Sequence, residues 1–259
     1  MTRQQRPWMM WIAILALLAG LGIGGVTLVA SMGVWFGLWD FRRGFALLQF
    51  ANAYAGWIAI AGLIITIGLL ALSQLWKIGN ASKLVSLALI GTAAAGLGYY
   101  VPEAYRPSEG ANIPPIHDVS TDTVDPPAYV AVLPLRADAP NTTVYGGSQG
   151  MTKERLAQLQ TDAYPDIKTL AIAQPPNVVF NRALAAVEEL GWELVAAVPA
   201  EGRIEATDTT FWFRFKDDVV IRIRPAGDGT IIDARSLSRV GGGDAGTNAR
   251  RLRAFFAVL

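Results

Sequence analysis

Long stretches without charge dominate the first hundred residues. Arg6 and Asp40 are separated by 33 uncharged positions, another 33 follow Arg43, and 19 follow Lys83. About 20 mostly apolar residues suffice for a helix to cross the hydrocarbon core of a bilayer. Helix is the expected conformation, because an unpaired backbone amide in lipid is costly. The pattern predicts a membrane unit over residues 1–101, with transmembrane helices at about 8–30, 45–72 and 84–101.

Small and polar positions inside these stretches indicate how the helices pack. Gly20, Gly22 and Gly25 match the Gly-x-Gly-x-x-Gly spacing of dinucleotide sites, but that chemistry requires a strand before the glycines and a helix after them. Inside an apolar helix, Gly20 and Gly24 instead favour close helix packing. Asn52 is the most polar residue of the second stretch, and we expect it to hydrogen-bond a neighbouring helix rather than to form a transport site.

Composition agrees with a membrane protein. Of the 259 residues, 52% are apolar and 17% are charged, whereas an ordinary soluble domain is about a quarter charged. The formal net charge of +1 gives no reason to expect a nucleic-acid partner. The chain has no cysteine, which excludes disulfides, zinc–thiolate sites and cysteine nucleophiles.

Basic residues near the helix ends predict the orientation through a small difference in their number. The first and third flanks carry four of them and the other two flanks three, which favours an N-terminus inside a bacterial inner membrane and a C-terminal domain on its periplasmic side. A cleaved signal peptide is the alternative for the first stretch, but that stretch is too long for a signal core. The two groups are Arg3, Arg6, Lys77 and Lys83, against Arg42, Arg43 and Arg106.

Prolines mark a change of structure after the third stretch. Eight of them lie between Val101 and Thr143, and proline fixes φ and removes a backbone donor. Residues 102–143 are therefore predicted to be an extended arm. The arm is expected to lie on the following domain, since Tyr129 and Val132 could cover apolar surface, with a free linker as the alternative.

The hydrophobic periodicity of residues 144–259 predicts a compact soluble domain. A helix is expected to end before Gly191, and a last helix is expected to be capped by Asp244. Between them the periodicity predicts an antiparallel sheet with helices on one face, a two-layer α+β architecture. The predicted helix covers 177–190, and the predicted strands cover 192–198, 203–207, 210–215, 217–224 and 230–237.

Strand alternation separates an apolar face from a charged one. Val219 and Ile221 point one way, and Asp218 and Arg222 the other. The charged face has two interpretations: cross-strand ion pairs on a solvated surface, or an arginine-bearing platform for a phosphate, a lipid headgroup or an acidic partner. Arg239, in the loop before the last helix, could assist an anion there. Asn248 and Arg251 are expected on a solvated face of that helix, within reach of Glu205 or Asp218. The candidate binding residues are Glu205, Asp218, Arg222, Arg224, Asp233, Arg235, Arg239, Asn248 and Arg251.

Several long segments of this domain resemble one protein family. They include Tyr-Pro-Asp-Ile at 164–167, Ile-Glu-Ala-Thr at 204–207 and Asp-Ala-Arg-Ser-Leu-Ser-Arg-Val-Gly at 233–241. These residues resemble the bacterial domain-of-unknown-function family 1499, over about residues 113–259. Some members of that family carry membrane spans ahead of the domain. The resemblance implies no established activity and therefore no catalytic residues.

The sequence contains few residues in arrangements that are typical of a catalytic site. His117 is the only histidine, and no Gly-x-Ser-x-Gly turn accompanies it. Asp118, Asp122 and Asp125 have only a loosely ligand-like spacing, so we expect no metal and no cofactor. We expect a non-enzymatic accessory or scaffold protein that sits in the bilayer and binds another envelope protein. The alternatives are the handling of an anionic lipid and an enzyme that uses Glu205 or Asp218 as a base.

Overall fold

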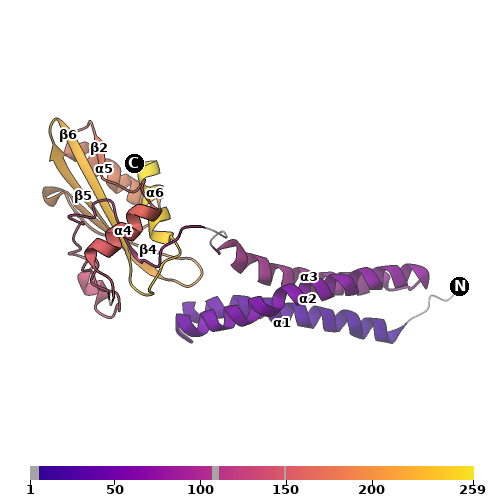
Figure 1. Ribbon diagram of the computed structural model, residues 1–259. Helices are drawn as coiled ribbons and strands as arrows, with labels where there is room; N and C mark the ends of the chain where they lie inside the picture. Colours follow the sequence, from indigo (N-terminus) through magenta and orange to yellow (C-terminus); the bar gives the residue numbers. More distant parts are fainter. Residues whose placement is uncertain (1–5, 107–110, 149) are drawn as a thin grey trace. The chain divides into compact units, whose positions relative to one another are not determined.

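The chain forms two compact units, Met1–Arg106 and Pro107–Leu259 (Figure 1). The structure is a computed structural model, which describes residues 6–106, 111–148 and 150–259. Arg3, used above for orientation, and positions 107–110 of the predicted arm lie outside the described residues.

Over its described residues, 6–106, the first unit consists of three helices: α1 (Pro7–Trp35), α2 (Phe41–Leu75) and α3 (Ala81–Ala104). Each is long and apolar enough to cross a membrane, as predicted. All three extend past their expected ends. At the start of α2, the side chain of Asp40 accepts a hydrogen bond from the backbone N–H of Arg43 at 3.0 Å. This cap satisfies one of the free amides of the helix and lets the helix begin before the apolar stretch does.

Glycines bring α1 and α3 into backbone contact. A Cβ on Gly20 would lie 1.9 Å from the carbonyl oxygen of Gly91, so only glycine fits there. The predicted packing role of Gly20 and Gly24 is confirmed, since a Cβ on Gly24 would likewise lie 2.6 Å from the carbonyl oxygen of Ala94. Asn52 also behaves as expected, donating from Nδ2 to Glu103 Oε1 on α3 at 2.6 Å.

The second unit is built on one antiparallel sheet with the strand order β1-β6-β5-β4-β3, and β2 also pairs with β6. The α+β class predicted from the sequence, an antiparallel sheet with helices, is correct. Two of the strands and the helix α4 were not anticipated, because three-residue strands show no periodicity and α4 is strongly polar. The elements are β1 (Asp118–Ser120), η1 (Leu133–Arg136), α4 (Lys153–Ala163), β2 (Leu170–Ile172), α5 (Pro176–Glu189), β3 (Glu193–Val198), η2 (Pro199–Glu201), β4 (Arg203–Thr209), β5 (Lys216–Ala226), β6 (Gly229–Ser238) and α6 (Thr247–Val258).

One predicted strand is wrong. Residues 210–215 do not form a strand but the loop that joins β4 to β5. The backbone N–H of Thr210 donates to the carbonyl of Phe215, and the N–H of Phe215 donates to Thr210 Oγ1, which closes the loop. Its aromatic residues favour a strand by propensity, but the pairing of β4 with β5 requires the chain to reverse there.

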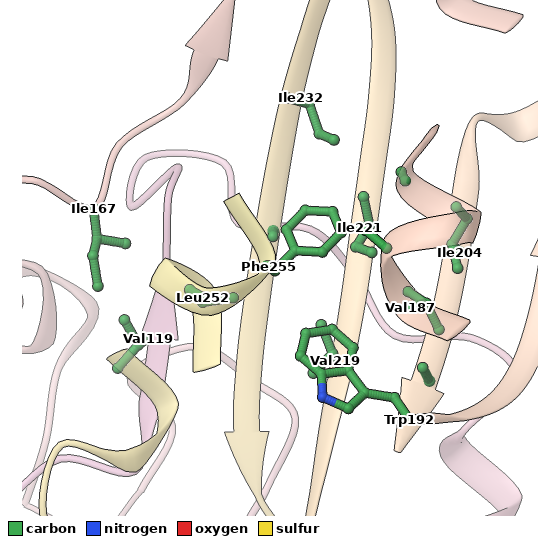
Figure 2. Close-up of a cluster of buried hydrophobic side chains, with 14 of the residues drawn as sticks. Val119, Ile167, Val187, Trp192, Ile204, Val219, Ile221, Ile232, Leu252 and Phe255 are labelled. Atoms are coloured by element: carbon green, nitrogen blue, oxygen red, sulfur yellow. The ribbon is translucent and has the colours of Figure 1, made fainter. Parts of the chain in front are cut away.

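The apolar face of the sheet is covered by helices and forms the main core. Ile204, Val219 and Ile221 project from the strands into a cluster with Val187 of α5 and Leu252 of α6. Figure 2 shows this cluster, in which the rings of Trp192 and Phe255 stack with centroids 6.0 Å apart. The predicted alternation of the strands is therefore confirmed on this face.

The predicted arm is a third, irregular layer on the opposite face of the sheet. Tyr129 and Val132 pack against Val220 and Leu237, whose side chains point away from the helices. The expectation that the arm lies on the domain is confirmed. Part of the arm is a strand, β1, and Gln160 of α4 bonds both the N–H and the carbonyl of Ser120 in that strand.

Candidate functional site

The charged face of the sheet is buried, not solvated. Glu205, Asp218 and Asp233 are fully buried, and Arg235 is 3% exposed. The arm covers them, which strand alternation could not reveal. The expectation of an open, solvated surface is therefore wrong.

Glu205 on β4 holds the arm through its backbone. The carboxylate accepts hydrogen bonds from three consecutive backbone N–H groups, those of Val130, Ala131 and Val132, at 2.9 to 3.2 Å. Arg203 pairs with the same carboxylate. Consecutive backbone amides form a concave anion site, and here the occupant is a side chain of the protein itself.

Asp218 on β5 is the meeting point of two arginines. Arg239 donates from Nε and Nη2 to the two carboxylate oxygens, at 2.9 and 2.8 Å, and Arg136 of the arm donates to one of them at 2.5 Å. Thr207 adds a hydrogen bond at 2.7 Å. Burial raises the pKa of Asp218, but the hydrogen bonds from Arg239, Thr207 and Arg136 outweigh burial and bring the pKa below its ordinary value.

Arg235 on β6 is held by the arm in the same way. Its guanidinium donates to both oxygens of Asp118 at 2.9 and 2.7 Å, and to the carbonyls of Pro127 and Thr143. Burial lowers the pKa of Arg235, but Asp118 more than offsets that effect, so the pKa lies above its ordinary value. The guanidinium of this arginine is therefore bound by groups of the domain itself.

The fourth group is the most exposed part of the face, and its charge is net negative. Arg222 and Arg224 both donate to Asp233, at 3.1 and 2.9 Å, while Arg222 also pairs with Asp122 and Asp125 of the arm. Two guanidiniums therefore meet three carboxylates. The loosely ligand-like aspartates Asp122 and Asp125 are engaged by arginine, and no cluster of metal-ligating side chains occurs among the residues that the structure describes.

Asn248 and Arg251 lie on the other face of the sheet. Both are buried, so the expectation of a solvated helix face is wrong for them. Arg251 pairs with Asp217 and Asp208 at 2.6 and 2.8 Å, not with Glu205 or Asp218. The reason is strand parity, since adjacent residues on a strand point to opposite faces.

Asp244 supplies the anion at the N-terminus of α6. Its carboxylate accepts hydrogen bonds from the backbone N–H groups of Gly246 and Asn248, both at 2.8 Å. The predicted capping by Asp244 is confirmed in its chemistry, although Gly246 occupies the N-cap position itself. Arg239, proposed as an anion ligand in this loop, turns instead to Asp218.

The sequence reasoning missed the partners that the arm contributes. Arg136 was not singled out, although it is the only lysine or arginine between Arg106 and Lys153 and it follows two leucines and a proline. It is 6% exposed and reaches Asp218. A lone arginine among the apolar and acidic residues of the arm is the signal that could have identified it.

A family model described as "Protein of unknown function (DUF1499)" matches residues 118–259, which begin with β1 and contain most of the arm as well as the sheet. The chain belongs to the DUF1499 family. No curated protein matches this chain. The match to DUF1499 covers all nine candidate residues together with the arm partners that bury them.

Proposed function

We propose that this DUF1499 protein is a non-enzymatic protein of a bacterial inner membrane that acts as an accessory or scaffold subunit for another envelope protein. Three apolar helices support the membrane location. With three crossings, the N-terminus and the DUF1499 domain lie on opposite sides. The slight excess of basic residues on the N-terminal side favours a periplasmic domain.

The observation that carries the proposal is the outer surface of the arm. Segment 130–136 is fixed to the sheet. Glu205 on β4 binds the start of the segment, and Asp218 on β5 binds its end. The same segment directs Val130, Leu133 and Leu135 outward, with 52, 45 and 53% of each residue exposed. A rigid segment that displays apolar side chains loses little conformational entropy on binding, which is what a protein-binding surface requires.

The charged face suits a structural role better than catalysis. Neither Glu205 nor Asp218 lines the hollow of about 420 Å³ at the start of α5, which includes Glu201 and Arg224 in its wall. A general base gains from a raised pKa and free access to substrate. Asp218 instead has a lowered pKa and lies beneath the arm.

Two observations weigh against the anionic-lipid alternative. The most exposed arginines of the charged face, Arg222 and Arg224, share three carboxylates, which leaves their cluster with a net negative charge. Arg224 also lies near the β5–β6 turn, at the opposite end of the sheet from Ile116, where the chain enters from the membrane unit.

Site-specific photocrosslinking in native membranes tests the arm as a binding surface. A benzophenone amino acid replaces Leu135 in one variant and Leu194, an exposed residue on β3, in a control. We expect one discrete protein adduct from position 135 and none from position 194. Equal labelling of many proteins at both positions, or adducts to lipid alone at position 135, would overturn the proposal.

A further inference from the structure

The loop between β4 and β5 is a second surface, and nothing in the proposed function uses it. Its sequence over residues 210–216 is Thr-Phe-Trp-Phe-Arg-Phe-Lys, four aromatic residues with two basic ones in a seven-residue stretch. Phe211 is 65% exposed, and the side chain of Lys216 is 46% exposed. Aromatic rings interleaved with basic side chains are typical of segments that settle at a membrane–water interface.

The loop is a closed structure rather than a loose connection. Besides the two hydrogen bonds between Thr210 and Phe215, the N–H of Arg214 donates to the carbonyl of Thr210 at 3.1 Å. The rings of Phe211 and Trp212 meet edge to face at 5.1 Å, and those of Phe213 and Phe215 stack at 5.9 Å. The aromatic side chains are thus held in two pairs.

Arg214 occupies an unusual backbone conformation in this loop. Its φ is +54°, in the left-handed region that glycine or asparagine adopts more readily. Residues other than glycine in this conformation cluster at functional sites, so Arg214 is a reason to look for a function here. A basic side chain placed there beside the aromatic residues matches the phosphates of lipid headgroups.

Strand register places the loop at the end of the domain where the chain arrives from the membrane unit. Asp118, the first residue of β1, pairs with Leu237, which pairs in turn with Asp218 near the start of β5. Beyond that row, the carbonyl of His117 accepts from the N–H of Ser238, and the carbonyl of Lys216 accepts from the N–H of Arg239. The entry point and the loop therefore project from the same end of the sheet, separated laterally by two to three strand spacings, about 10–15 Å.

The connecting chain limits how far that end of the domain lies from the end of α3. Only 12 residue steps separate Ala104, where α3 ends, from Ile116, which is buried in the core. Even fully extended, 12 residues reach about 40 Å, about the diameter of a domain of this size. A tether of this length holds the loop at a high effective concentration near the membrane surface.

We propose that loop 210–215 docks on the lipid bilayer, with its aromatic rings at the level of the headgroups and with Arg214, together with Lys216 at the start of β5, against lipid phosphates. This second attachment orients the domain on its tether. The proposal requires only that α3 spans the membrane. It holds for either side of the membrane and does not depend on a protein partner.

The test uses full-length protein in nanodiscs of phosphatidylethanolamine and phosphatidylglycerol. Because the chain lacks cysteine, Phe211→Cys carries a single environment-sensitive fluorophore. Asp228→Cys, in the exposed turn at the opposite end of the sheet, is the matched control. Nitroxide-bearing lipids quench only fluorophores that touch the bilayer.

We expect at least threefold stronger lipid quenching at position 211 than at position 228, with a blue-shifted emission at position 211 alone. Equal quenching at the two positions would overturn the proposal. So would a fluorophore at position 211 that is shielded from an aqueous quencher but not reached by lipid nitroxide, because the loop would then pack on protein. Protease resistance of the domain reports folding, and Phe213→Cys repeats the test if Phe211→Cys misfolds.

Discussion

Arg239 and Asp218 form a two-point ion pair, with Nε and Nη2 of the arginine 2.9 and 2.8 Å from the two carboxylate oxygens. Arg136 of the arm donates a hydrogen bond to the same carboxylate. One aspartate thus joins the end of β6, the start of β5 and the arm. This arrangement explains how charged residues on a sheet face can be buried.

Loss of the Asp218 charge should loosen this part of the domain. In Asp218→Asn, the buried guanidinium of Arg136 loses its ion pair, and breaking such a pair costs about 3–5 kcal/mol. We expect hydrogen exchange of the amides in β5 and in segment 130–136 to accelerate by at least 100-fold in the full-length protein. Asp228→Asn, in an exposed turn, is the control and should change neither. An unchanged exchange rate in Asp218→Asn would show that the pair is dispensable.

The pKa of Asp218 predicts how the domain responds to acid. A carboxyl whose pKa is lower in the folded state stabilises the fold above its unfolded pKa of about 4, and this stability is lost as the pH falls towards the folded pKa. Thr207→Val removes a hydrogen bond that lowers this pKa. The midpoint of acid unfolding, followed by protease sensitivity, should move to higher pH in Thr207→Val. A midpoint that stays in place or moves lower would contradict the assignment.

Glu205 should control the arm more than the sheet. In Glu205→Gln, an amide group replaces one oxygen that now faces the backbone N–H groups of residues 130–132. We expect faster hydrogen exchange in that segment, by about 10- to 100-fold, with little change in β6. Glu201→Gln is the comparison, because Glu201 also pairs with Arg203 but lies on the surface. Equal effects of the two substitutions would mean that the amide contacts do not hold the arm.

Helix packing in the membrane unit depends on Gly20. A Cβ there would collide with the backbone of Gly91, whereas a Cβ on Gly22 meets nothing within 4 Å. Gly20→Ala should therefore destabilise the bundle by about 1–3 kcal/mol, the usual cost of overpacking, and Gly22→Ala should not. Unfolding in mixed detergent micelles measures the difference. Similar stability of the two variants would argue against close contact between α1 and α3.

Local sequence patterns predicted those features that depend on neighbouring residues. Charge-free stretches identified three helices, and the period of two correctly separated Val219 and Ile221 from Asp218 and Arg222. The patterns failed where distant segments meet. Tyr129 and Val132 indicated that the arm lies on the domain, but no local pattern indicated that the arm would bury the charged face. The aromatic residues at 211–213 favoured a strand and concealed a chain reversal.

The candidate residues show the same difference between features set by local sequence and contacts between distant segments. Glu205, Asp218 and Asp233 were correctly placed on one face, but their partners in the arm lie about 75 to 115 positions away in sequence. Asn248 and Arg251 were assigned to a solvated helix face, whereas the structure pairs Arg251 with Asp217 on the helix-covered side. Such pairings follow from the tertiary fold and not from spacing.

Native mass spectrometry of the full-length protein, released from its own membranes, tests the scaffold proposal most directly. We predict a stoichiometric complex with a second envelope protein. That complex should be lost in Leu135→Glu, which alters the arm surface, and retained in Leu194→Glu, which alters an exposed residue on β3. A protein that carries only phospholipid, or a complex that survives Leu135→Glu unchanged, would contradict the proposal that this DUF1499 protein binds its partner through the arm.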